Sequence, residues 1–273
     1  MAEMLEKWSF HDLRFVVETL VPERSDPEHV VELIHDDEPL LEAMLQDDRL
    51  LQQLLADDAA FASVSPLFFF KVLLLRARRD LEQELYTVER RHQQKVVLFD
   101  ASRVVDLLRR PAVSDYLAWL LASFMRVNSF VIPIQTRPGQ WQRLRVNDLD
   151  VDSLLRYAQL LDADRRFGVH KRIGDACLFL SGLFPEYIEA QQRYPHSGAP
   201  RMRLRSTVLQ DREDYESYGR AFYHLAAGDK QAKAEGVEEV LTILSEQFVL
   251  AEKPLAFLAE RYLGLYKNRL FDL

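Results

Sequence analysis

The spacing of apolar and polar positions predicts helices along most of the chain. Leu13, Val16, Val17 and Leu20 recur at helical spacing and end before a proline. A second helix is expected after Asp26-Pro27, because an acidic residue followed by proline is typical of a helix N-terminus. Three acidic pairs follow, each expected at the start of a short helix, where negative charge faces the positive end of the helix dipole. The pairs are Asp36-Asp37, Asp47-Asp48 and Asp57-Asp58.

Longer helices are predicted in the rest of the chain. The longest begins after Ser65-Pro66 and runs from Leu67 to about Arg91, with apolar residues such as Phe68 and Val88 on its core face. A helix from Arg166 to about Phe184 is expected to be buried, and its Gly174 and Gly182 are places where another backbone can come close. Further helices are expected over residues 101–110, 115–126, 151–161, 211–227, 231–248 and 254–266.

Residues 128–146 interrupt the helical pattern. Phe130–Ile134 is rich in β-branched residues, Arg137–Gln140 has the composition of a turn, and Trp141–Val146 alternates between apolar and polar positions. This pattern predicts an antiparallel β-hairpin, and Pro133 favours an edge position. Residues 201–206 alternate in the same way and predict a further strand.

The predicted fold is therefore mainly α: a multi-helix globular domain of about ten helices with a small antiparallel β-hairpin or sheet near residues 128–146 and 201–206. We expect an N-terminal helical part over residues 1–127 and a C-terminal part over residues 128–273, packed as one continuous unit. With 48% hydrophobic residues, the 273-residue chain has ample material for a core of that size.

The cellular location is predicted from three features. The lone Cys177 excludes an internal disulfide and suits a reducing compartment. The first residues are charged and polar, without the layout of a secretory signal. Apolar runs are interrupted well short of the roughly 20 residues that span a bilayer. We therefore expect a cytoplasmic protein with no membrane partner.

The net charge of −8 is unevenly distributed. Residues 1–64 hold 16 acidic and 4 basic residues, residues 65–135 and 136–210 each carry a net charge of +4, and residues 211–273 carry −4. This segregation suggests either a basic surface for an anionic partner or docking of the acidic part on the basic part. Acidic helices that are simply solvated remain a third explanation.

Two arginine-bearing extended segments are the main binding candidates. In a strand, Trp141, Arg143 and Arg145 share one face, and so do Arg201, Arg203 and Arg205. If the segments pair, their guanidinium groups would gather where they could bind carboxylate or phosphate. The anion could be a nucleic acid, an acidic protein, a small ligand, or residues 36–58 of this chain. Independently solvated arginines on an exposed face are the alternative without a ligand.

A second basic group opens the helix predicted over residues 166–184, and it comprises Arg165, Arg166, Lys171 and Arg172. Cations at a helix N-terminus oppose the dipole, which favours a bound anion there. Nearby, Cys177 as nucleophile, His170 as base and Asp175 as orienting group would form a hydrolase site. The cysteine, however, lies in an apolar run that is typical of inert packing.

Two pairs of residues have the spacing of metal ligands. Glu32…His35 and Glu89…His92 have the Glu-x-x-His spacing of di-iron bundles. His35 falls at a helix end, and Glu89 and His92 stand among polar residues, whereas ligands of that class point into a core. Phosphate-binding glycine loops, dinucleotide fingerprints and nucleophile elbows are missing from the sequence. We expect no cofactor and find no catalytic signature.

Tyr215, Tyr218 and Phe222 recur at helical spacing and predict a core-facing aromatic stripe. Taken together, the sequence favours a non-enzymatic adaptor or regulatory protein whose basic central face contacts an acidic protein or a nucleic acid. One alternative is a metalloprotein or enzyme with a dispersed active site. Another is a homo-oligomeric structural protein that uses the tyrosine-bearing helix as its interface.

Overall fold

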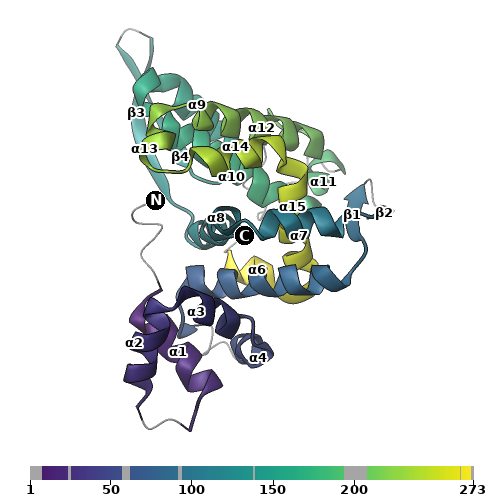
Figure 1. Ribbon diagram of the computed structural model, residues 1–273. Helices are drawn as coiled ribbons and strands as arrows, with labels where there is room; N and C mark the ends of the chain where they lie inside the picture. Colours follow the sequence, from purple (N-terminus) through teal and green to yellow (C-terminus); the bar gives the residue numbers. More distant parts are fainter. Residues whose placement is uncertain are drawn as a thin grey trace. The chain divides into compact units, whose positions relative to one another are not determined.

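The fold is mainly α-helical, with two small antiparallel sheets of two strands each (Figure 1). The computed structural model describes residues 8–23, 26–56, 62–91, 94–137, 139–193, 208–264 and 266–271. The predicted fold class is confirmed. The chain divides into two compact units: unit 1 comprises Met1–Tyr86 with Asp100–Ala122, and unit 2 comprises Thr87–Phe99 with Ser123–Leu273.

Unit 1 is built from helices that begin at capping residues. Its helices are α1 (Phe10–Leu20), α2 (Pro27–Asp36), α3 (Glu38–Leu45), α4 (Asp48–Ala56), α6 (Pro66–Gln83), α7 (Ala101–Leu108) and most of α8 (Pro111–Phe124). Asp37 caps α3, and Asp48 lies in the first turn of α4. The expected placement of the first two acidic pairs is thus confirmed, whereas Asp57-Asp58 lies outside the described residues.

A buried carboxylate joins two of these helix starts. Asp12 is 1% exposed and accepts hydrogen bonds from Ser9 Oγ at 2.7 Å and from Ser9 N at 3.2 Å. It also accepts from Ser65 N at 2.7 Å and Ser65 Oγ at 2.8 Å. Ser65 caps α6 in turn, by accepting from the amide of Phe68. One side chain therefore completes the cap of α1 and anchors the start of α6.

The predicted extension of the longest helix to Arg91 is wrong. α6 ends at Gln83, Leu85 is 80% exposed, and β1 (Thr87–Arg91) pairs with β2 (Gln94–Leu98). The two strands contain Thr87 and three valines, whose branched side chains favour a strand over a helix. The hairpin belongs to unit 2, although the helices before and after it belong to unit 1.

Unit 2 contains the predicted central hairpin and most of the predicted C-terminal helices. Its further elements are β3 (Ser129–Arg137), β4 (Gln140–Asn147), α9 (Val151–Leu160), a 3-10 turn (Ala163–Arg165), α10 (Phe167–Leu183), α11 (Pro185–Arg193), α12 (Arg212–Ala227), α13 (Lys230–Ala234), α14 (Glu238–Glu246), α15 (Phe248–Leu258), a π-helical turn (Ala259–Leu263) and α16 (Tyr266–Leu270). The helix predicted over residues 231–248 is divided, because Gly236 adopts φ +66° between α13 and α14. The strand predicted over residues 201–206 lies outside the described residues.

The core of unit 2 is closely packed around α10. A Cβ added at Gly174 would lie 2.7 Å from the ring of Tyr223, and one added at Gly182 would lie 2.9 Å from Leu255 Cβ and 3.3 Å from a backbone carbonyl of α15. The predicted close approach of another backbone is confirmed at Gly182, whereas at Gly174 the side-chain ring of Tyr223 approaches instead.

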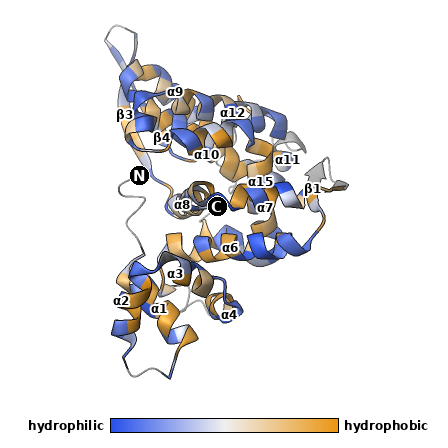
Figure 2. Cartoon of the chain, in the orientation of Figure 1, coloured by the Kyte–Doolittle hydropathy of each residue, from blue (hydrophilic) through white to orange (hydrophobic). Residues whose placement is uncertain are grey.

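Figure 2 shows hydrophobic and hydrophilic stretches side by side along the helices of both units, as expected of amphipathic helices. No described helix is both long and apolar enough to cross a membrane.

Candidate binding surface

The β3–β4 hairpin presents one fully exposed face. Its register pairs Val131 with Arg145, Pro133 with Arg143, and Gln135 with Trp141. Residues directly opposite each other in an antiparallel pair lie on the same face of the sheet. All six are exposed, and Trp141 is 65% exposed. We call these six residues the hairpin face: Val131, Pro133, Gln135, Trp141, Arg143 and Arg145.

The opposite side of the hairpin is fixed to the helices of unit 2. Val146 is buried, Ile132 and Leu144 are half-buried, and the ring of Phe130 meets that of Tyr157 on α9 edge-on at 5.3 Å. The hairpin runs alongside α9 and its turn extends beyond that helix (Figure 1). Because this packing leaves only one orientation for the strands, it directs the hairpin face to solvent.

The hairpin carries positive charge without local compensation. Residues 129–147 contain three arginines and no acidic residue, in a chain that has 43 acidic residues. Arg145 donates to Ser129 Oγ at 3.3 Å. Within the described part of the chain, no carboxylate forms an ion pair with Arg137, Arg143 or Arg145. Their charges are therefore available to an external anion.

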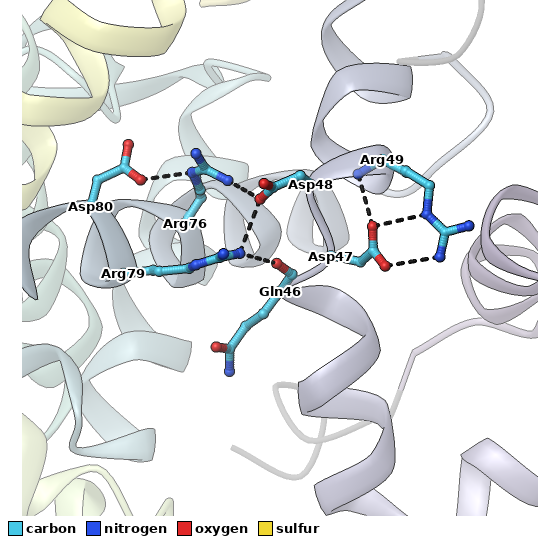
Figure 3. A network of polar contacts seen from close by, with 7 residues as sticks. All are labelled: Gln46, Asp47, Asp48, Arg49, Arg76, Arg79 and Asp80. Carbon is cyan, nitrogen blue, oxygen red and sulfur yellow. Dashed lines mark hydrogen bonds and ion pairs between the residues drawn. The ribbon is translucent and has the colours of Figure 1, made fainter. Parts of the chain in front are cut away.

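The arginines of α6 behave differently, because unit 1 supplies their anions. Arg76 and Arg79 both contact Asp48 at the start of α4, and Arg79 also donates to the carbonyl of Gln46 at 3.1 Å (Figure 3). Arg76 further pairs with Asp80 at 2.8 Å. Some of the positive charge of α6 is thus neutralised inside unit 1 by carboxylates of the acidic short helices.

Three members of the second basic group have partners within unit 2. Lys171 is buried and pairs with Asp175 at 3.1 Å. Arg172 pairs with Asp148 at 2.9 Å, donates to a serine hydroxyl of α8 at 2.7 Å, and its guanidinium lies 3.5 Å from the ring centroid of Phe124. The third is Arg166, which donates to the carbonyl of Leu161 at 2.9 Å, whereas the fourth member, Arg165, is exposed.

The remaining predicted contacts to an anion, Arg201, Arg203 and Arg205, lie outside the described residues. Their pairing with β4 stays a prediction.

The arrangement of Cys177, His170 and Asp175 does not support a nucleophilic site. Cys177 is fully buried, and burial raises the pKa of its thiol far above the usual range, so the thiolate is strongly disfavoured. Asp175 is occupied by Lys171 and by the hydroxyl of Tyr223, which donates to it at 2.9 Å. His170 packs edge-on against an aromatic ring of α12, and burial lowers its pKa.

The weak metal candidates are equally scattered. Glu32 and His35 are exposed on α2, where Glu32 lies 3.9 Å from His29 and His35 lies 3.0 Å from Asp36. The Glu89 side chain and His92 fall outside what the structure describes. Among the described residues, no group of three or more His, Cys, Asp or Glu side chains is placed to hold a metal ion.

A buried ion pair in unit 2 was missed by sequence reasoning. Glu252 on α15 is 1% exposed, and its Oε2 accepts from Arg212 Nη2 at 2.7 Å. Arg212 also pairs with Glu216 at 3.1 Å. Burial raises the pKa of Glu252 to about 7, against the opposing effect of Arg212. The i,i+4 spacing of Arg212 and Glu216 and the position of Glu252 in an apolar run were the available signals.

The aromatic stripe of α12 is rotated from its predicted position. Tyr215 and Tyr223 are buried with Gly219 between them, whereas Tyr218 and Phe222 stack on each other at the half-exposed flank. A Cβ at Gly219 would fall 2.2 Å from the ring of Phe248 and 3.1 Å from Cys177 Cβ, so this face of α12 packs on the start of α15 and on α10.

Comparison of the chain with protein-family models, with curated proteins and with solved structures found no match.

Proposed function

We propose that this chain is a binding protein of the cytoplasm, an adaptor or regulator, which contacts an anionic partner through the hairpin face. The observation that carries the proposal is a sheet face whose six residues are all exposed and which holds Trp141, Arg143 and Arg145, on a hairpin without any acidic residue. A cationic face on a chain of net charge −8 would also orient the protein toward an anionic partner.

The geometry of β4 strengthens the case for an anion. Side chains two residues apart on a strand are separated by roughly 7 Å, so Arg143 and Arg145 stand side by side as like charges. An anion between or along them would relieve their repulsion. The hairpin face offers positive charge, hydrogen-bond donors and an aromatic ring, which are means of recognition. It has no nucleophile or general base, so the proposed role is recognition and not catalysis.

The test is binding of a fluorescent heparin, used as a generic polyanion, over a series of salt concentrations. We expect binding that weakens as salt is raised and that is lost in the double variant Arg143→Glu/Arg145→Glu. The matched control is Arg103→Glu/Arg110→Glu, which reverses two exposed arginines in unit 1 and leaves the net charge of the two variants equal. Equal binding by both variants, or no binding by the native protein at low salt, would refute the proposal.

A further inference from the structure

Trp141 is the feature of the hairpin face that positive charge alone does not explain. Trp141 is 65% exposed although it stands on a strand. Its cross-strand neighbour is Gln135, and in the described part of the chain it has no aromatic partner. A tryptophan ring gains most by covering a flat apolar surface. The partner should therefore offer a flat surface in addition to negative charge.

The three side chains lie in a line along β4. Trp141, Arg143 and Arg145 face the same way, with a step of roughly 7 Å between them. Each nucleotide of a nucleic-acid strand provides one flat base and one anionic phosphate. Stacking on an aromatic ring and contact with guanidinium groups are the means by which proteins bind such strands without reading their sequence.

Other anionic partners match only part of this surface. A duplex hides the faces of its bases in the stack and offers only their edges. An acidic peptide supplies carboxylates for the arginines but no flat face for the indole. An anionic membrane would favour an apolar tip, whereas the turn end of this hairpin carries Gln135, Arg137 and Gln140.

We propose that the anionic partner is single-stranded nucleic acid, with a base stacked on Trp141 and backbone phosphates held by Arg143 and Arg145. This inference rests on the proposed function, since it names the partner of the same surface. Val131 and Pro133, which lie opposite the arginines, provide the rigid floor against which the strand would pass.

The probe is a labelled oligothymidylate of about twelve nucleotides, within the usual range of site sizes. It is compared with an abasic oligonucleotide of equal length, which keeps the phosphates and lacks the bases. We expect the oligothymidylate to bind more tightly. Trp141→Ala should weaken its binding by roughly 5- to 150-fold, the range of base–aromatic stacking, and leave abasic binding unchanged. Trp141→Phe should retain most of the affinity, and Tyr266→Ala, which removes another exposed aromatic of unit 2, should retain all of it.

The outcomes separate the two proposals. Equal affinity for the two oligonucleotides, or no effect of Trp141→Ala, overturns the single-strand inference; if Arg143→Glu/Arg145→Glu still weakens both, the proposed function stands. Tighter binding of a duplex, of polyglutamate or of vesicles rich in phosphatidylserine overturns the inference in favour of that partner class. If none of these anions binds, both proposals fail.

Discussion

The buried carboxylate of Glu252 makes a specific prediction about stability and pH. Burial raises its pKa from 4.5 to about 7 in the folded protein, while in the unfolded chain it titrates near its ordinary value. Between these two pH values the folded protein binds more protons than the unfolded chain, so its stability falls as pH rises. The contribution of Glu252 to the free energy of unfolding is fully present below about pH 4.5 and is lost as pH rises through about 7. Its full size is ~3 kcal/mol, from ~1.4 kcal/mol for each tenfold change in proton affinity.

Glu252→Gln tests this directly, because glutamine keeps the shape of the side chain and does not titrate. Arg212 keeps its second anion, Glu216, in this variant. The free energy of unfolding is measured in urea from about pH 5 to pH 8 for both proteins. We expect the native protein to lose stability relative to the variant as pH rises.

Subtracting the free energy of unfolding of one protein from that of the other at each pH removes the contribution of other titrating groups. The lowered pKa of His170 acts in the opposite direction, since it adds stability that is present above the ordinary histidine pKa and lost as pH falls. This effect is common to both proteins and cancels. Two results would contradict this prediction: a difference in unfolding free energy that does not vary with pH, or a native protein whose stability rises relative to the variant as pH rises. Either would show that the effect of Arg212 on the pKa of Glu252 is larger than the effect of burial.

Three further predictions concern packing and capping. Asp12→Ala should lower the free energy of unfolding by ~2–3 kcal/mol in urea titrations, because the amide of Ser9 and the start of α6 both lose the carboxylate that accepts their hydrogen bonds. Gly219→Ala should cost ~1–3 kcal/mol by the clash with Phe248, whereas Gly228→Ala, where a Cβ meets nothing closer than 3.6 Å, should be nearly neutral. Cys177 should react with a thiol reagent only at the rate of unfolding, as followed by mass spectrometry; fast labelling of the native protein would contradict its burial.

The elements that sequence reasoning placed correctly are those with strong local signals. Ser65-Pro66 and Asp26-Pro27 mark helix starts by caps that act within one turn, and residues 128–146 differ from their surroundings in composition. The predicted extension of α6 was wrong because Leu85, Val88 and charged residues continue past Gln83 at a spacing that a helix would also accept. Whether Val88 packs in a helix or a strand depends on its pairing with β2, which a local pattern does not contain.

The candidate site likewise has features that local signals predicted and features that depend on contacts between distant residues. Alternation along β4 correctly put Trp141, Arg143 and Arg145 on one face, but it did not determine which face would be covered by α9. For Lys171 and Arg172, a run of positive charge in the sequence concealed partners at other positions. The Lys171–Asp175 pair had a helical i,i+4 spacing that could have been recognised. The Arg172–Asp148 pair joins residues 24 positions apart and could not be predicted from local spacing.

That long-range pair allows the role of Arg172 to be tested. Asp148 accepts from Arg172 at 2.9 Å and from the amide of Asn128 at 3.0 Å, so it ties the base of the hairpin to α10. If Arg172 itself bound the anion, Asp148→Ala would release its guanidinium and raise the affinity for oligothymidylate. If the pair instead positions the hairpin, the same variant should lower that affinity several-fold, although it removes a negative charge. We expect the loss, because the hydroxyl of Ser123 and the ring of Phe124 still hold the guanidinium of Arg172 in this variant. A gain would place Arg172 among the residues that contact the anion.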